Sequence, residues 1–203
     1  RDLGRELQLV SDAAALLGWD QEVLLPAKGV PYRAEQMAWF SGYLHERFAT
    51  TEVGDWITSA EDKASASGDP FVAANLREWR RQHTRATCLP KKLVEEFAES
   101  TALAQAAWAE AREKSEFARF APHLTKLVTL SREHAERWGY VDCPYDALLD
   151  QFERGATAHR LSETLGDLRE VLLPVVEEAI AQAPLDKTKF AARYPKEKQE
   201  AFN

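Results

Sequence analysis

Hydrophobic residues along this chain recur mainly at intervals of three and four, the spacing that places side chains on one face of an α-helix. The pattern is clearest between Leu89 and Gly155, where it predicts two long helices and a short third one. Each segment has its own start signal and its own stop signal. The sequence therefore predicts an all-α fold, an antiparallel array of about seven to nine helices without a sheet.

The first of these helices follows Pro90, a residue suited to position N1 of a helix, and is about twenty residues or 30 Å long. Its predicted core face is formed by Leu93, Phe97, Thr101, Ala104, Trp108 and Ala111. Because Trp108 lies on this face, we predict that it anchors the core and does not stack on a ligand. Trp108→Ala should then cost roughly 3–5 kcal/mol of folding free energy.

The second helix is predicted to begin at Pro122 and to end at Gly139, which can take the left-handed conformation common at helix C-termini. The third opens at Pro144. The apolar faces consist of Leu124, Leu127, Val128, Ser131, Ala135 and Trp138 in the second helix, and of Tyr145, Leu148, Leu149 and Phe152 in the third.

Before this central stretch, the pattern predicts an N-terminal helix that ends near Gly18 and helices over residues 33–48 and 52–67. Asp20 is interpreted as a cap of the following turn, in preference to a catalytic acid, and Trp19 as a seal on the end of the core. Residues 65–69 have the composition of a loop, and Asp69 and Pro70 then suit the N-cap and N1 positions of another helix. The apolar positions are Leu3, Leu7, Val10, Ala14 and Leu17, then Met37, Phe40, Leu44 and Phe48, then Trp56 and Ile57, and then Val72, Leu76, Trp79 and His83.

After the central stretch, Thr157 suits an N-cap, and the chain's longest apolar stripe follows it. Pro174 lies inside this stripe, so a kink is expected between Glu170 and Pro174. The stripe comprises Leu161, Leu165, Leu168, Leu172, Val175, Ala179 and Ala183, and a weakly patterned end with Phe190, Tyr194 and Phe202 includes a further helix start at Pro195.

Three arginines, Arg77, Arg81 and Arg85, line one face of the helix that starts at Pro70. Like charges at this spacing repel one another, so an acidic group should face them. One interpretation, which we favour, is structural pairing with a neighbouring helix, for which the candidates are Glu95, Glu96 and Glu99. The other is that the arginines line a groove and bind the carboxylate of a peptide.

Composition narrows the function classes. The 203 residues are 45% hydrophobic and 29% charged, with a net charge of −7, which argues against a general nucleic-acid binder. Cys88 and Cys143 signal neither a disulfide framework nor a cysteine zinc site, and no apolar run suits a membrane span or a signal peptide. We therefore expect a soluble cytoplasmic protein. The absent initiator methionine and the helix opening after Pro195 suggest that the chain is a piece of a longer protein.

The sequence resembles the N-terminal half of the carboxypeptidase Taq family, the thermostable zinc-dependent metallocarboxypeptidases. The resemblance rests on ordered segments: Trp19-Asp20, Arg33-Ala34-Glu35-Gln36, Asn75 to Arg81, Leu89-Pro90, Trp108 to Arg112, Phe117 to Pro122, and Pro144 to Asp150. One departure is Glu153-Arg154-Gly155, where the family commonly has Glu-Pro-Gly. The resemblance implies a parent enzyme that uses zinc or cobalt to remove C-terminal residues from peptides and that forms a homodimer.

The metal-binding chemistry that this resemblance implies is an HExxH helix, and it is not found in residues 1–203. His45-Glu46 begins such a motif, but Ala49 occupies the position of the second histidine. The other histidines, His83, His123, His134 and His159, are scattered. We expect no catalytic, cofactor or metal-binding residue in this single helical region, and expect it to wall or cover a substrate groove. Two other interpretations remain open: a helical scaffold for protein–protein interaction, and a helical bundle that binds a small ligand.

Overall fold

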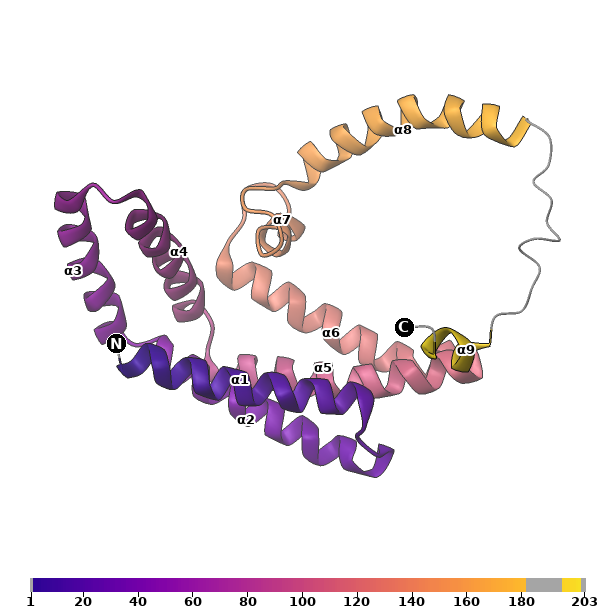
Figure 1. The fold of residues 1–203 in the computed structure, drawn as a ribbon, viewed down its shortest axis with the longest axis horizontal. Helices are drawn as coiled ribbons and strands as arrows, with labels where there is room; N and C mark the ends of the chain where they lie inside the picture. The colour runs from indigo at the N-terminus through magenta and orange to yellow at the C-terminus, as the bar shows by residue number, and fades with distance from the viewer. Residues whose placement is uncertain (1, 182–194, 202–203) are drawn as a thin grey trace.

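A computed structural model describes residues 2–181 and 195–201, and within these ranges the chain forms helices and no strand (Figure 1). The all-α prediction is therefore confirmed. In chain order the elements are α1 (Asp2–Val23), the 3-10 helix η1 (Ala27–Gly29), α2 (Val30–Phe48), α3 (Thr51–Ser67), α4 (Pro70–Thr87), α5 (Lys91–Lys114), α6 (Phe117–Trp138), α7 (Pro144–Leu149), α8 (Ala158–Ala181) and α9 (Lys196–Glu200).

Helices α1, α2, α5 and α6 form the body of the structure. Helix α5 lies between α2 and α6 and packs against both, and α1 packs against α2. Small residues occupy the contacts: Ala34, Ala104 and Ala135 are 1%, 3% and 0% exposed. At Gly42 of α2 an added Cβ would lie 2.2 Å from Oε1 of Glu95 on α5, so the Glu95 side chain packs directly against the α2 backbone at this glycine.

Helices α3 and α4 form an antiparallel hairpin that projects from one end of the body (Figure 1). Gly68, with φ 69° and ψ 8°, ends α3 in the left-handed conformation that glycine adopts readily. The Asp69 carboxylate accepts a hydrogen bond of 2.9 Å from the Phe71 N–H, which confirms the predicted cap. The loop predicted over residues 65–69 is shorter than expected, because α3 continues to Ser67.

Four other predictions about helix ends differ from the structure. Helix α1 continues through Gly18 to Val23, and α6 begins at Phe117 and passes through Pro122. A glycine inside a helix costs only about 1 kcal/mol, and a proline in the second turn removes one backbone hydrogen bond, so packing of the rest of the helix outweighs both. Pro90 is the N-cap of α5 and not its N1 residue, and Gly139 has φ 80° and ψ 153°, outside the left-handed helical region.

Helix α8 leaves the body after α7 and contacts it sparsely (Figure 1). The Arg160 N–H donates a hydrogen bond of 3.2 Å to Oγ1 of Thr157, which confirms the predicted cap. The helix continues through Pro174 and is curved in Figure 1, so the proline does not end it. The stripe position Ala183 and the aromatic residues Phe190, Tyr194 and Phe202 lie outside the described residues. Across the described ranges, no helix is long and apolar enough to cross a bilayer.

Candidate functional site

The arginine stripe on α4 meets an acidic residue at the end of α7. Nη2 of Arg81 lies 2.6 Å and Nη1 of Arg85 lies 2.7 Å from Oδ2 of Asp150. Arg81 also donates to the Asp150 carbonyl oxygen, and Arg85 donates to the carbonyl of Ala147 at 3.0 Å. These contacts connect the α3–α4 hairpin to the segment that follows α6, so two of the three arginines pair with an acidic side chain, as the structural interpretation expected.

The predicted partners of the stripe on α5 were wrong. Helix α5 packs on α2 and α6, and two of the three candidates, Glu95 and Glu96, pair with lysines of these helices. Oε1 of Glu95 lies 3.7 Å from Nζ of Lys91, and Glu96 pairs with Lys126. The residue that faces the arginines, Asp150, is distant in sequence and was not among the candidates.

Trp138 completes the cluster around Arg85. The guanidinium carbon of Arg85 lies 4.0 Å from the centroid of the Trp138 ring, and the indole N–H donates to the Arg85 carbonyl oxygen at 3.2 Å. Burial lowers the pKa of Arg85. Burial of Asp150 acts to raise its pKa, but the Gly155 N–H, the hydrogen bond from Arg81 and the charges of both arginines outweigh it, and the net shift is downward. The carboxylate therefore stays charged and engaged with both arginines at neutral pH.

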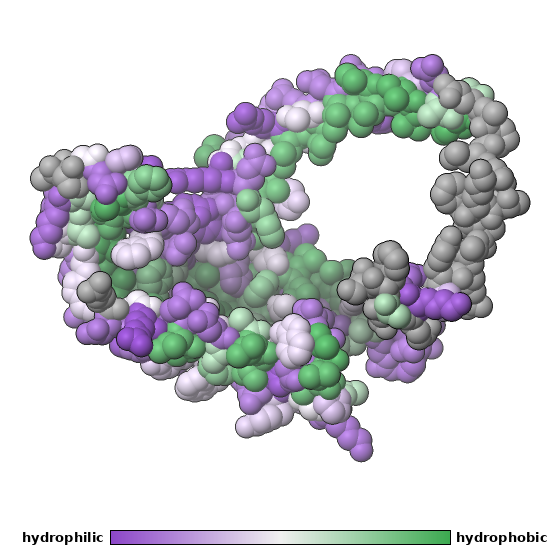
Figure 2. All heavy atoms as spheres, in the orientation of Figure 1, coloured by the Kyte–Doolittle hydropathy of each residue, from purple (hydrophilic) through white to green (hydrophobic). Residues whose placement is uncertain are grey.

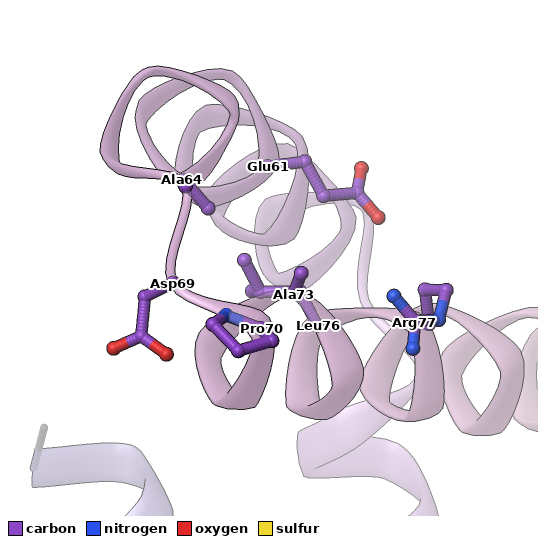
Figure 3. A pocket seen from close by; sticks show the side chains of 8 residues that line it. Glu61, Ala64, Asp69, Pro70, Ala73, Leu76 and Arg77 are labelled. Carbon is purple, nitrogen blue, oxygen red and sulfur yellow. The ribbon is translucent and has the colours of Figure 1, made fainter.

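Arg77, the first arginine of the stripe, does not contact Asp150 and lines a cavity of about 330 Å³ between α3 and α4. Figure 3 shows Arg77 and Glu61 on the same side of this cavity, whereas the Asp69 carboxylate points away from it. The Glu61 carboxylate binds Arg80, with Nη2 to Oε2 at 2.7 Å. Among the residues that the structure describes, Arg77 forms no ion pair. It is the positively charged residue among those that line this cavity.

A buried arginine connects α1 to α2. Arg33 is 7% exposed, and its Nη2 lies 2.6 Å from Oδ2 of Asp20. Its Nε donates to Oε1 of Gln36 at 3.0 Å, and its Nη1 donates to the carbonyl of Leu17. The expected roles of the Trp-Asp pair were wrong, because Asp20 lies inside α1 and binds Arg33, and Trp19 is 56% exposed. Two segments of the sequence resemblance are thus in direct contact.

Burial also corrects the prediction for Trp108. Its side chain is 46% exposed, at the rim of a second cavity near the α5–α6 turn. The guanidinium carbon of Arg112 lies 5.3 Å from the centroid of its ring. The spacing placed Trp108 on the face of α5 that is buried at Ala104 and Ala111, but only its neighbours on that face reach the core.

The histidines do not converge on one point. His83 and His134 are buried, and each bonds to a backbone carbonyl, of Thr50 and of Leu130, at 2.8 Å. His45 is half-buried, and Nδ1 of the exposed His159 lies 3.6 Å from a Glu163 carboxylate oxygen. Within residues 2–181 and 195–201, no group of three or more His, Cys, Asp or Glu side chains could hold a metal ion, so these residues do not fit a zinc site.

Comparison with known proteins gives matches over the full length of the chain. The family model described as carboxypeptidase Taq (M32) metallopeptidase matches residues 1–203. Thermostable carboxypeptidase 1 of Thermus thermophilus is 32% identical over 210 residues, which cover 98% of this chain and 41% of the relative. Carboxypeptidase 1 of Bacillus subtilis is 30% identical over 204 residues, which cover 100% of this chain and 40% of the relative.

Solved structures agree with this assignment. The crystal structure of BsuCP superposes with a TM-score of 0.91 at 27% identity, over 99% of this chain and 40% of that one. The structure of Pyrococcus furiosus carboxypeptidase gives a TM-score of 0.73 at 28% identity, over 100% of this chain and 41% of that one. The chain therefore spans about two fifths of the length of these relatives. By its sequence and by its fold, the chain belongs to the carboxypeptidase Taq (M32) metallopeptidase family.

Proposed function

We propose that this chain is the N-terminal part of a metal-dependent carboxypeptidase that removes C-terminal amino acids from peptides, with zinc or cobalt as its metal. The observation that carries the proposal is the family match over residues 1–203, to relatives that are carboxypeptidases and of which the chain covers about 40%. The described residues do not fit a metal site. The metal ligands of the proposed enzyme therefore belong to the part of the family chain outside this match.

In the proposed enzyme, the helices described here wall or cover the substrate groove. Two features of the structure support this role. The α3–α4 hairpin projects from the body and is connected to α7 through Arg81, Arg85 and Asp150 (Figure 1). Arg77 presents a cation in the cavity of this hairpin, where it would attract the carboxylate of a peptide. The chain contributes shape and charge to the groove and no catalytic group.

The test of the activity is a chimera in which residues 1–203 replace the matching part of Bacillus subtilis Carboxypeptidase 1. We expect the chimera to release the C-terminal amino acid from an N-blocked dipeptide, to lose this activity with a chelator, and to regain it with zinc or cobalt. The 203-residue chain alone should be inactive and should not bind zinc tightly. Chelator-sensitive release by the chain alone would refute the proposal, and a folded chimera that is inert with every divalent metal would favour the scaffold interpretation.

The role of the hairpin is tested separately by Arg77→Gln in the active chimera. If Arg77 attracts the substrate carboxylate, KM should rise about tenfold or less with kcat nearly unchanged, because the contact contributes to substrate binding in general. Arg5→Gln, at an exposed position of α1, is the matched control and should change neither constant. An unchanged KM for Arg77→Gln would show that the charge of Arg77 does not contribute to substrate binding. The hairpin would then contribute only to the shape of the groove.

The remaining expectations concern assembly and location. We propose that the parent enzyme acts on peptides as a homodimer and binds neither nucleic acid nor membranes. The net charge of −7 supports the part of this proposal that concerns nucleic acid. We also place it in the cytoplasm, on the basis of the two free thiols of Cys88 and Cys143.

A further inference from the structure

Helix α8 exposes its hydrophobic face along its whole length. None of its residues is buried, and Leu168, Leu172 and Val175 are 48%, 47% and 59% exposed. Further apolar side chains widen this face: Leu165, Val171, Leu173, Val176 and Ile180. A stripe of this width on one helix normally faces a protein core, and contiguous exposed apolar surface of this kind marks an interaction site.

The opposite face of α8 is acidic. Glu163, Asp167 and Glu170 in the first half and Glu177 and Glu178 in the second lie away from the apolar stripe, at helical spacing. An amphipathic helix that binds an anionic membrane surface usually carries Lys and Arg on its polar face. The acidic face therefore argues against a lipid surface and in favour of a protein as the partner of the apolar stripe.

A second hydrophobic surface lies across from α8. Figure 2 shows an open space between α8 and the body, with hydrophobic atoms along the edge of α8 and along the facing border formed by α5 and α6. On α6, Leu124 and Val128 are 38% and 41% exposed, although they belong to the predicted apolar stripe of this helix. An occupant of this space would cover apolar side chains on both of its sides.

The position of α8 is shared with a much longer protein. The superposition on BsuCP has a TM-score of 0.91 and covers 99% of this chain, so α8 stands in the same place relative to the body in both structures. The matched region is only 40% of the BsuCP chain. In a chain of that length, the exposed apolar face of α8 is available for contact with a segment outside the matched region.

We propose that the apolar face of α8, together with the apolar border of α5 and α6 across the open space of Figure 2, is the docking surface for the part of a carboxypeptidase Taq chain that lies outside this match. The occupant is a helical segment of that part with apolar residues on two sides. A second copy of this chain fits less well, because pairing two α8 faces would leave the α6 side uncovered. The inference rests on the family membership and does not depend on the proposed groove or on activity.

Cysteine labelling tests the docking surface directly. Leu172→Cys places a thiol on the apolar face, and Glu170→Cys places one on the acidic face as a matched control. Each variant is labelled with a maleimide in two forms, the 203-residue chain alone and the chimera with Bacillus subtilis Carboxypeptidase 1. Peptide mass spectrometry separates the new thiol from Cys88 and Cys143. The readout needs no activity, so failure of the proposed function and failure of the docking surface are distinguishable.

We expect the thiol at position 172 to react about tenfold or more slowly in the chimera than in the chain alone, and the thiol at position 170 to react at similar rates in both. Equal rates at position 172 in the two forms would overturn the proposal. Protection in the chain alone that grows with its concentration would assign the face to a second copy, and protection only with phosphatidylglycerol vesicles would assign it to a membrane. The same substitutions at the aligned positions of the intact Bacillus subtilis enzyme give the same readout should the chimera not fold.

Discussion

The guanidinium of Arg85 and the carboxylate of Asp150 form an ion pair of 2.7 Å between Nη1 and Oδ2, although 65 residues separate them in sequence. The pair joins α4 to the end of α7, two elements that otherwise belong to different parts of the structure. Asp150 accepts from Arg81 as well, so one carboxylate fixes two arginines. This carboxylate therefore helps to hold the α3–α4 hairpin against the end of α7, together with the hydrogen bond from Arg85 to the Ala147 carbonyl.

Asp150→Asn should destabilise the protein by about 1–3 kcal/mol, because the substitution leaves the charge of Arg85 without an acidic partner and that of Arg81 with Glu78 alone. The side chain of Asp150 is 29% exposed, so the cost should be below that of a fully buried pair. Urea unfolding measures the difference. Glu163→Gln is the control, since its pair with His159 is largely exposed and should contribute less than about 0.5 kcal/mol. Equal effects of the two substitutions would contradict the role of Asp150.

Protonation of the Glu6 carboxylate at acidic pH should weaken the contact between α1 and α2. Hydrogen bonds from Arg47 and Tyr43 lower the pKa of Glu6 from 4.5 to about 2. Because the folded-state pKa lies below the unfolded one, the contact stabilises the fold fully above pH 4.5, and its contribution is lost as the pH falls from 4.5 towards 2. A carboxyl NMR titration should find Glu6 ionised at pH 3.5, and Arg47→Gln should move its midpoint back towards 4.5. A midpoint near 4.5 in the unaltered protein would contradict this assignment.

Local sequence patterns predicted most of the helices. The caps at Asp69 and Thr157 were read correctly because an N-cap depends on the residue itself and its next two or three neighbours. The end at Gly18 and the start at Pro122 were predicted wrongly, because packing of a whole helix outweighs the cost of about 1 kcal/mol for a glycine and about 3 kcal/mol for a proline. Helix positions were thus predictable, and helix ends set by tertiary packing were not.

The candidate site was less predictable, since its contacts are long-range. The stripe of Arg77, Arg81 and Arg85 showed that an acidic group should face α4, but spacing cannot show that the group is Asp150. The contact between Asp20 and Arg33 was likewise hidden. Asp20 and Arg33 both lie in segments that resemble the family. This resemblance was the only feature of the sequence that singled them out, and it does not indicate which residues are in contact.

Trp108→Ala should cost about 1–2 kcal/mol, less than the 3–5 kcal/mol that its place on the α5 stripe predicted, because the side chain is 46% exposed. The loss consists of the buried part of the ring and its contact with Arg112. Leu130→Ala is the comparison, since Leu130 is 3% exposed and its truncation should cost about 2–5 kcal/mol. Denaturant unfolding that gave Trp108 the larger effect would place its ring in the core.

Arg154→Pro should be neutral or stabilising by up to about 1 kcal/mol, because it restores the Glu-Pro-Gly order of the resembling proteins and restricts the unfolded chain. In the surrounding turn, Glu153 and Ala156 donate backbone hydrogen bonds to Leu149 and Glu153, and no bond from the Arg154 N–H is found among the described residues. Gly155→Ala is the contrasting change, since Gly155 has φ 76° and alanine there should cost about 1 kcal/mol or more. Clear destabilisation by Arg154→Pro in thermal melts would show that this turn differs from the family's.

Gly42→Ala should destabilise the contact between α2 and α5. The added Cβ would lie 2.2 Å from Oε1 and 2.6 Å from Cγ of Glu95, so the whole Glu95 side chain, and not only its end, would have to move. Overpacking of this kind costs about 1–3 kcal/mol, and the better helix propensity of alanine recovers at most about 1 kcal/mol.

Gly166→Ala provides the matched control for this prediction. Gly166 is also helical, but nothing lies within 4 Å of the Cβ position in α8, so the substitution should stabilise the chain by about 0.5–1 kcal/mol through helix propensity alone. Urea unfolding of both variants then separates propensity from packing at the α2–α5 crossing. Stabilisation by Gly42→Ala of the same size as by Gly166→Ala would mean that Glu95 moves aside without cost and that the close approach does not limit the residue at position 42.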